Sequence, residues 1–225
     1  GSAGIQTAAF FAGGQKAPGL ANETELYNGT SWTEVNNINT SKRYFPGVGT
    51  TTAGLIFGGT PPDTAETELW NGTNWTEVNN LQTARRGLAG AGTNTAALGF
   101  GGNDPSPAAK NETELWNGTN WTEVNNLNTA RSYLGGAGTS TAALAFGGTG
   151  AGSYKNETEL WNGTNWTEVN NLQTARSKPG GAGTQTSALA FGGVPRPPGH
   201  TETWNGTNWT TVANMAAARS LLGGA

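Results

Sequence analysis

The chain of 225 residues contains no cysteine and only one histidine, His200. The absence of cysteine excludes disulfides, thiolate metal sites and cysteine nucleophiles. A lone histidine has no second imidazole with which to share a metal ion. We therefore expect neither a metal centre nor a cofactor.

Charge is also scarce, since 12% of the residues are charged and the net charge is −3, against about 25% charged residues in an average protein. Nothing in this balance attracts nucleic acid or an anionic membrane. No apolar run reaches 18 residues and no basic-then-apolar leader opens the chain. We expect no membrane insertion and no signal peptide in this chain.

No capped stretch carries apolar residues at helical spacing, whereas one sequence repeat recurs along the whole chain. A Trp-Thr pair returns at Trp32, Trp75, Trp121, Trp166 and Trp209, at spacings of 43, 46, 45 and 43 residues. A period of 40 to 50 residues is typical of four-stranded propeller blades. Within one unit, four short strand-like segments alternate with Gly, Asn and Thr turn signals, and Asn-Gly supplies the positive φ of a tight hairpin.

Three passages of the repeat resemble the kelch repeat: the double glycine after an apolar strand, the aromatic-turn-Trp passage, and the cation that precedes the next first strand. They occur at Ala145–Gly148, Leu160–Val169 and Leu127–Ser132. This resemblance implies a β-propeller. The Asn-, Thr- and Gly-rich composition is also similar to that of kelch-like repeats of phage tail-associated and other virion proteins.

We predict an all-β, five-bladed propeller of four-stranded antiparallel blades that forms a single domain over residues 1–225. The stretch at 219–225 is interpreted as a first strand without its second, and Ala3–Gly14 as a second strand without its first. The ring is expected to close by pairing one C-terminal strand with three N-terminal strands. The expected blades are residues 219–225 with 3–38, then 39–81, 82–127, 128–172 and 173–215. The leading Gly1-Ser2 resembles an expression remnant.

Most repeated residues have a structural interpretation. The Gly-x-Gly segments are flanked by strands and not followed by a helix, so we interpret them as crowded inner strands rather than a phosphate-binding loop. The nine tryptophans occupy two repeat positions and predict a core between blades. The repeated glutamates lack the unlike environments that a carboxylate pair needs for glycosidase chemistry, and we expect them to pair with the repeated cation or face solvent. We predict that the chain is not an enzyme.

The repeats differ mainly in two segments: the loop after the double glycine, and the residues after the repeated cation. In an up-and-down blade both emerge at the same end, so the variation maps to one face. These segments hold seven basic and two acidic residues, a net charge of +5, while the repeated framework carries −8. The candidate ligand-binding residues on this variable face are Arg43, Tyr44, Arg86, Tyr133, Tyr154, Lys178 and Arg196.

Two functions of different classes follow. One is a non-catalytic binding or structural module, of the phage tail-fibre or surface-adhesin type, whose variable face recognises an anionic glycan or a virion or host surface protein. The other is a multivalent lectin with one sugar pocket per blade. In either role we expect a monomer, located on a virion or an extracellular surface.

Overall fold

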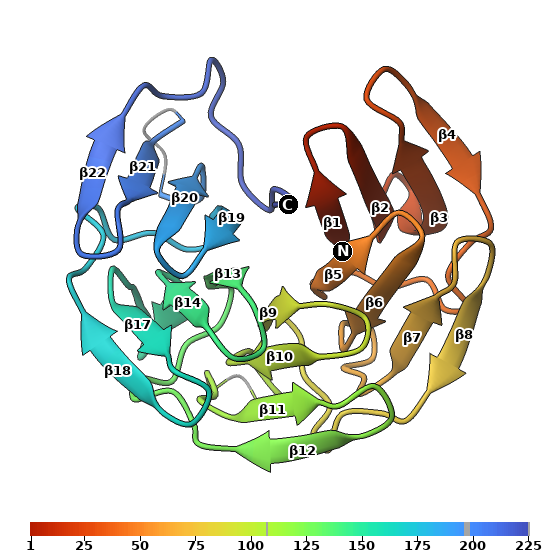
Figure 1. The fold of residues 1–225 in the computed structure, drawn as a ribbon, viewed down its shortest axis with the longest axis horizontal. Coiled ribbons are helices and arrows are strands. Elements are labelled where there is room, and N and C mark those ends of the chain that lie inside the picture. Colours follow the sequence, from red (N-terminus) through yellow and green to blue (C-terminus); the bar gives the residue numbers. More distant parts are fainter. Residues whose placement is uncertain (107, 196–198, 225) are drawn as a thin grey trace.

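The computed structural model describes residues 1–106, 108–195 and 199–224, and it confirms the predicted fold. Five four-stranded antiparallel sheets are arranged as the blades of a propeller ring (Figure 1). In each blade the strands follow one another from the axis to the rim in sequence order. No helix in the described ranges is long and apolar enough to cross a membrane.

We number the blades in chain order and give their strands here. Blade 1 contains β1 (Ser2–Ile5), β2 (Ala8–Lys16), β3 (Gly19–Tyr27) and β4 (Trp32–Val35). Blade 2 contains β5 (Gly47–Thr50), β6 (Ala53–Phe57), β7 (Thr67–Trp70) and β8 (Trp75–Val78). Blade 3 contains β9 (Ala89–Gly92), β10 (Ala97–Phe100), β11 (Thr113–Trp116) and β12 (Trp121–Val124). Blade 4 contains β13 (Gly135–Gly138), β14 (Ala143–Phe146), β17 (Thr158–Trp161) and β18 (Trp166–Val169), and its loop forms the small hairpin β15 (Thr149–Gly150) and β16 (Ser153–Tyr154). Blade 5 contains β19 (Gly180–Thr184), β20 (Ser187–Phe191), β21 (Thr201–Trp204) and β22 (Trp209–Val212).

The inner strands are rich in glycine because neighbouring blades approach closely at the axis. A Cβ atom on Gly136 of β13 would lie 2.9 Å from the Phe100 ring and 3.0 Å from the Gly90 carbonyl oxygen, both in blade 3. Such distances are too short for a side chain, so glycine permits the packing of β13 on β9. The Gly-x-Gly words are therefore inner strands, as predicted.

The Asn-Gly sequences form the turns between the third and fourth strands. In blade 2 the Asn71 side chain accepts the backbone N–H groups of Thr73 and Asn74, both at 2.9 Å, and Gly72 has φ +93°. This Asx turn explains the repeated Asn-Gly-Thr wording through backbone geometry.

The repeated aromatic residues form the core between blades. Trp70 is 1% exposed and donates its indole N–H to the Thr51 carbonyl at 2.8 Å, while Trp75 is 6% exposed and packs edge-on against Phe10 of blade 1. Eight of the nine tryptophans are buried in this way, and Trp32 is the exposed one, at 51%.

The predicted closure by a C-terminal strand is not what the structure shows. The innermost strand of blade 1 is β1, whose Ser2 pairs with Phe11 and whose Ala3 pairs with Phe10. Gly1 and Ser2, expected to be an expression remnant, belong to this edge, since Gly1 and Ala12 exchange hydrogen bonds of 2.7 and 2.8 Å. The residues from 213 to 224 form no strand and cross the open side of the ring toward the axis (Figure 1). The physical reason is the register of the repeat. The distance from Ser2-Ala3-Gly4 to the double glycine of blade 1 equals the distance from Gly47-Val48-Gly49 to the double glycine of blade 2.

Candidate functional site

The two variable segments of each repeat meet on one face of the ring, as predicted. Isolated β-bridges join the residue after the repeated cation to the loop after the double glycine. They are Arg43 to Thr60, Arg86 to Asn103, Ser132 to Thr149 and Ser177 to Val194. Each bridge holds the entrance of a first strand against a variable loop, so the two segments share one surface.

Five residues in equivalent positions surround the propeller axis on this variable face, each two places after the repeated cation. All have left-handed backbone conformations, with φ between 52° and 63°: Tyr44, Gly87, Tyr133, Lys178 and Leu221. Their main chains are joined head to tail, because each N–H from Gly87 onward donates to the carbonyl oxygen of the preceding member. These bonds are 2.7, 2.6, 2.7 and 3.2 Å long. We call these five residues the mouth ring.

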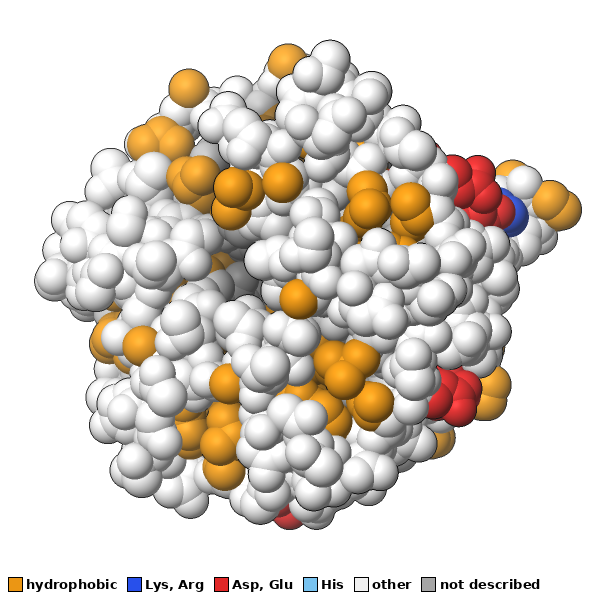
Figure 2. All heavy atoms as spheres, turned by 45° about the vertical axis from the view of Figure 1, so that its right-hand side comes forward, with side chains coloured by type: hydrophobic (Ala, Val, Ile, Leu, Met, Phe, Trp, Pro, Cys, Tyr) orange, Lys and Arg blue, Asp and Glu red, His pale blue; other side chains and the backbone are white. Residues whose placement is uncertain are grey.

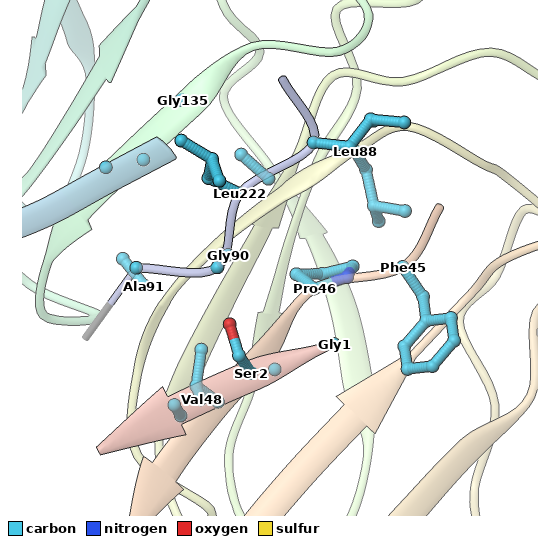
Figure 3. A pocket seen from close by; sticks show the side chains of 18 of the residues that line it. Gly1, Ser2, Phe45, Pro46, Val48, Leu88, Gly90, Ala91, Gly135 and Leu222 are labelled. Atoms are coloured by element: carbon cyan, nitrogen blue, oxygen red, sulfur yellow. The ribbon is translucent and has the colours of Figure 1, made fainter. Parts of the chain in front are cut away.

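A cavity of about 520 Å³ runs along the axis below the mouth ring. Its wall consists of the inner strands, and Figure 3 shows that Val48, Ala91 and Leu88 present apolar side chains there. Ser2 contributes the one side-chain oxygen among the labelled residues in that view. The side chains of the channel wall are therefore mainly apolar, and the charged side chains, Arg43 and Lys178, lie at the mouth.

Two aromatic residues and two cations converge at the mouth. The rings of Tyr44 and Tyr133 meet edge to face, with centroids 5.4 Å apart and an interplanar angle of 88°. Gly87 lies between them in the mouth ring, and a Cβ atom there would be 2.9 Å from the Tyr133 ring. The Arg43 guanidinium carbon lies 4.8 Å from the Tyr44 ring centroid, and the Lys178 ammonium lies 5.0 Å from the Tyr133 centroid. Both distances are within cation–π range.

Most other cations of the variable segments have acidic partners. Arg86 pairs with Asp63 at 2.5 Å, and this hydrogen bond, with a weaker one to Tyr133, raises the pKa of the Arg86 guanidinium. Three further pairs are Lys16–Glu23, Lys110–Asp104 and Lys155–Glu157. In the described part of these segments only Arg43 and Lys178 lack an acidic partner, and Arg43 donates to the Gln15 side chain. The net positive charge of the variable face therefore concentrates at the mouth.

Five of the seven candidate residues are thus brought together: Arg43, Tyr44, Tyr133 and Lys178 line the cavity mouth, and Arg86 stands behind Tyr133. Tyr154 does not join them, because it lies in the β15–β16 hairpin, 46% exposed and away from the cavity lining. Arg196 lies outside the described residues. Sequence reasoning missed Gly87, Leu221 and Asp63, although the common offset of two residues after the repeated cation marks the first two.

The rest of the repeated polar chemistry supports the fold. Each of four repeated cations is buried against the glutamate that follows the first threonine of the next third strand, in the pairs Lys42–Glu68, Arg85–Glu114, Arg131–Glu159 and Arg176–Glu202. Arg131 also donates to two backbone carbonyl oxygens, those of Gly147 and Glu157, and burial lowers the pKa of its guanidinium. These groups hold neighbouring blades together and do not face the channel.

Charged side chains are unevenly spread over the surface. Figure 2 shows a view of the ring, hollowed near its middle, on which Lys and Arg appear only at one projecting margin. No group of three His, Cys, Asp or Glu side chains in the described ranges is arranged to hold a metal ion. His200 lies beside blade 5, where its carbonyl oxygen accepts from Arg176 at 2.9 Å.

No protein-family model matches this chain, and no curated protein matches its sequence.

Proposed function

We propose that this protein is a non-catalytic binding module that holds one acidic glycan chain at the mouth of its central channel. The observation that carries this proposal is that two cations without an acidic partner in the described structure, Arg43 and Lys178, lie against the paired rings of Tyr44 and Tyr133. A cavity of about 520 Å³ is within the usual size of small-ligand sites.

The chemistry of the mouth suits an acidic sugar. A guanidinium binds a carboxylate or sulfate through two parallel hydrogen bonds, and the ammonium adds a second positive charge. Tyrosine presents a flat apolar surface with a polar tip, on which the apolar face of a sugar ring can lie while the hydroxyl bonds its rim. The anion is thereby held next to the aromatic surface that packs on its ring.

A single site per chain is supported over one sugar pocket per blade. The repeated groups that a lectin would use are engaged in hydrogen bonds between blades: the buried Trp75 indole donates to Thr24 at 2.9 Å, and the exposed Asn79 amide donates to Asn120 at 2.8 Å. The five mouth positions, in contrast, carry four different residue types. The multivalent lectin therefore remains the second candidate.

The setting we propose is a phage tail fibre or a surface adhesin, in which this face meets a host glycan or a glycan-bearing surface protein. The kelch-like passages of the sequence support a scaffold of this kind, since propeller faces commonly carry binding loops on a rigid frame.

The test is a calorimetric titration with two oligosaccharides of equal length, one of uronic acid units and one neutral. We expect one acidic chain per protein, weaker binding at high salt, and no binding of the neutral chain. Arg43→Gln and Lys178→Gln should each weaken binding about tenfold or more, since a hydrogen bond to a charged group contributes about 1.5–3 kcal/mol.

Lys155→Gln is the matched control, because that lysine pairs with Glu157 away from the cavity lining. Its affinity for the acidic chain should equal that of the unaltered protein. Binding of about five sugars per chain, or indifference to the Arg43 and Lys178 variants, would replace this proposal with the lectin.

A further inference from the structure

The contact between blade 5 and blade 1 differs from the other four contacts between neighbouring blades, which we call seams. At each of the four intact seams a phenylalanine of one blade packs on a fourth-strand tryptophan of the next. These pairs are Phe10–Trp75, Phe57–Trp121, Phe100–Trp166 and Phe146–Trp209. Each such tryptophan also donates its indole N–H to a buried threonine of the preceding blade. A buried cation–glutamate pair completes each intact seam.

At the fifth seam the equivalent groups are present but apart. Trp32 of blade 1 is 51% exposed and contacts Tyr27 of its own blade. Glu25, equivalent to Glu68, and Arg219, equivalent to Arg176, are both exposed, and no ion pair or hydrogen bond joins them in the described structure. Figure 1 shows the ring open between β22 and the strands of blade 1.

Large apolar side chains are exposed on both sides of this opening. Phe11 of blade 1 is 42% exposed, and Leu189 and Val212 of blade 5 are each 39% exposed. The counterparts of Leu189 and Val212 in blade 3, Leu98 and Val124, lie in a core cluster or against it. The opening therefore presents two apolar faces, one with an unpaired anion and the other with an unpaired cation.

C-terminal residues lie at the axis of the ring, between the inner strands of blades 5 and 1. A Cβ atom on Gly181 would contact the Gly136 carbonyl of the preceding blade, and one on Gly224 would contact the Gly181 carbonyl in turn. The C-terminal residues thus continue the series from blade to blade. On the other side, Gly223 meets the Ser2 side chain of β1. Residues 222–224 therefore occupy a sixth position at the axis, between β19 and β1.

The path to this sixth position follows the repeat. The Gly193 N–H donates to the Arg219 carbonyl at 2.8 Å, as the Gly148 N–H does to the Arg176 carbonyl, also at 2.8 Å. Leu222 contacts the position of Gly192 as Leu134 contacts that of Gly101. Residues 219–224 thus follow the course that the equivalent residues take before each first strand.

We propose that the opening is a docking site for one further repeat of this kind, which supplies the second, third and fourth strands of a sixth blade. Its tryptophan packs on Phe191 and donates to Thr201, and its glutamate pairs with Arg219. On its other side its phenylalanine covers Trp32 and its cation pairs with Glu25. This occupant matches the apolar surface and the unpaired charge of both faces, and it continues the interface that four seams already use. The proposal is independent of the ligand at the channel mouth.

Closure of blade 5 directly onto blade 1 fits the structure less well. Residues 222–224 separate β19 from β1 at the axis. At each intact seam one asparagine side chain donates to another, as Asn125 does to Asn165 at 2.8 Å. At the fifth seam Ala213 and Ser31 stand at the equivalent positions, so neither asparagine is present. Neither blade carries the asparagine that would form this bond with the other.

The experiment compares the chain with a version in which residues 138–176 are repeated after Ala225, so that the sixth blade is covalently supplied. Hydroxyl-radical labelling read by mass spectrometry reports the exposure of each tryptophan. In the unaltered chain we expect Trp32 to be labelled and Trp121 to be protected. In the extended chain the reactivity of Trp32 should fall to that of Trp121.

A second measurement adds a synthetic peptide of residues 138–176 to the unaltered chain. One peptide should bind per chain and protect Trp32, and Glu25→Lys and Arg219→Glu should each weaken that binding. Protection of Trp32 in the unaltered chain without peptide would overturn the proposal, because the ring would then close on itself. So would continued labelling of Trp32 in the extended chain.

Discussion

Trp121 of blade 3 donates its indole N–H to the Thr67 hydroxyl of blade 2 at 3.0 Å, beneath the ring of Phe57. The donor and acceptor are 54 residues apart in the chain and both are buried. This single polar bond inside an aromatic contact recurs at four seams. It therefore sets the relative position of neighbouring blades, which apolar packing alone does not do, because a hydrogen bond is directional.

Trp121→Phe should destabilise the protein much more than Trp32→Phe. The first change removes a buried donor and leaves the Thr67 hydroxyl without its partner, which costs about 1–3 kcal/mol. The second alters a half-exposed ring with no indole hydrogen bond, so we expect less than about 0.5 kcal/mol. Chemical denaturation of both variants measures the difference. Equal losses would show that Trp32 is buried at a seam like the others.

Arg131→Met should cost about 3–5 kcal/mol of unfolding free energy, because it leaves the buried Glu159 carboxylate without its cation. Arg219→Met is the matched control at the open seam, where the equivalent arginine is exposed, and it should change stability by less than about 0.5 kcal/mol. Thermal or denaturant unfolding compares the pair. A small cost for the Arg131 variant would mean that Glu159 finds water or another partner.

Gly87→Ala should weaken binding of the acidic oligosaccharide. The new methyl group would press on the Tyr133 ring, and a left-handed backbone costs an L-residue about 1–2 kcal/mol. Gly152→Ala is the control, because Gly152 has φ +76° but no atom within 4 Å of the added Cβ. Both variants should lose stability, and only the Gly87 variant should lose affinity in calorimetry. A normal affinity for that variant would remove the tyrosine pair from the site.

Lys110→Met should raise the pKa of Asp104, which is lowered chiefly by its hydrogen bond to Lys110 and further by Ser106. NMR titration of the carboxyl carbon follows this pKa directly. Because the pKa is lower in the folded protein, the pair stabilises the fold above the ordinary carboxyl range, and that contribution is lost as the pH falls through the folded pKa. The variant should therefore lose less stability in acid than the unaltered chain. An unchanged pKa would assign the shift to Ser106.

The blade architecture was predictable because its determinants are local and repeated. The period of the Trp-Thr pair, the Asn-Gly turns and the Gly-x-Gly inner strands each constrain one blade, and five copies agree. The second residue of each Glu-Thr-Glu pair was expected to meet the repeated cation or face solvent, and Arg131–Glu159 shows the first outcome. These inferences needed only side chains at fixed offsets.

Two other features depend on long-range geometry and were not predictable in the same way. Gly1-Ser2 and Gly223-Gly224 are two copies of the same repeat positions, at the start of a first strand, and the sequence alone does not decide which copy pairs with β2. The prediction chose the C-terminal copy and was wrong, because β1 is adjacent in sequence to β2 and needs only a short turn. Similarly, the sequence gives the variable segments seven basic residues, whereas local ion pairs such as Arg86–Asp63 neutralise four of them in the folded chain.

The mouth ring has a consequence for how such a protein can diversify. Its members are joined through main-chain amides, so the ring does not depend on which side chains its members carry. A tyrosine, a glycine, a lysine and a leucine already occupy equivalent places with nearly the same φ. Five neighbouring positions can therefore be exchanged in combination, each at a modest cost in stability that asparagine or glycine would reduce. The mouth ring can thus carry many combinations of side chains on one backbone, and a new specificity would need changes in very few codons.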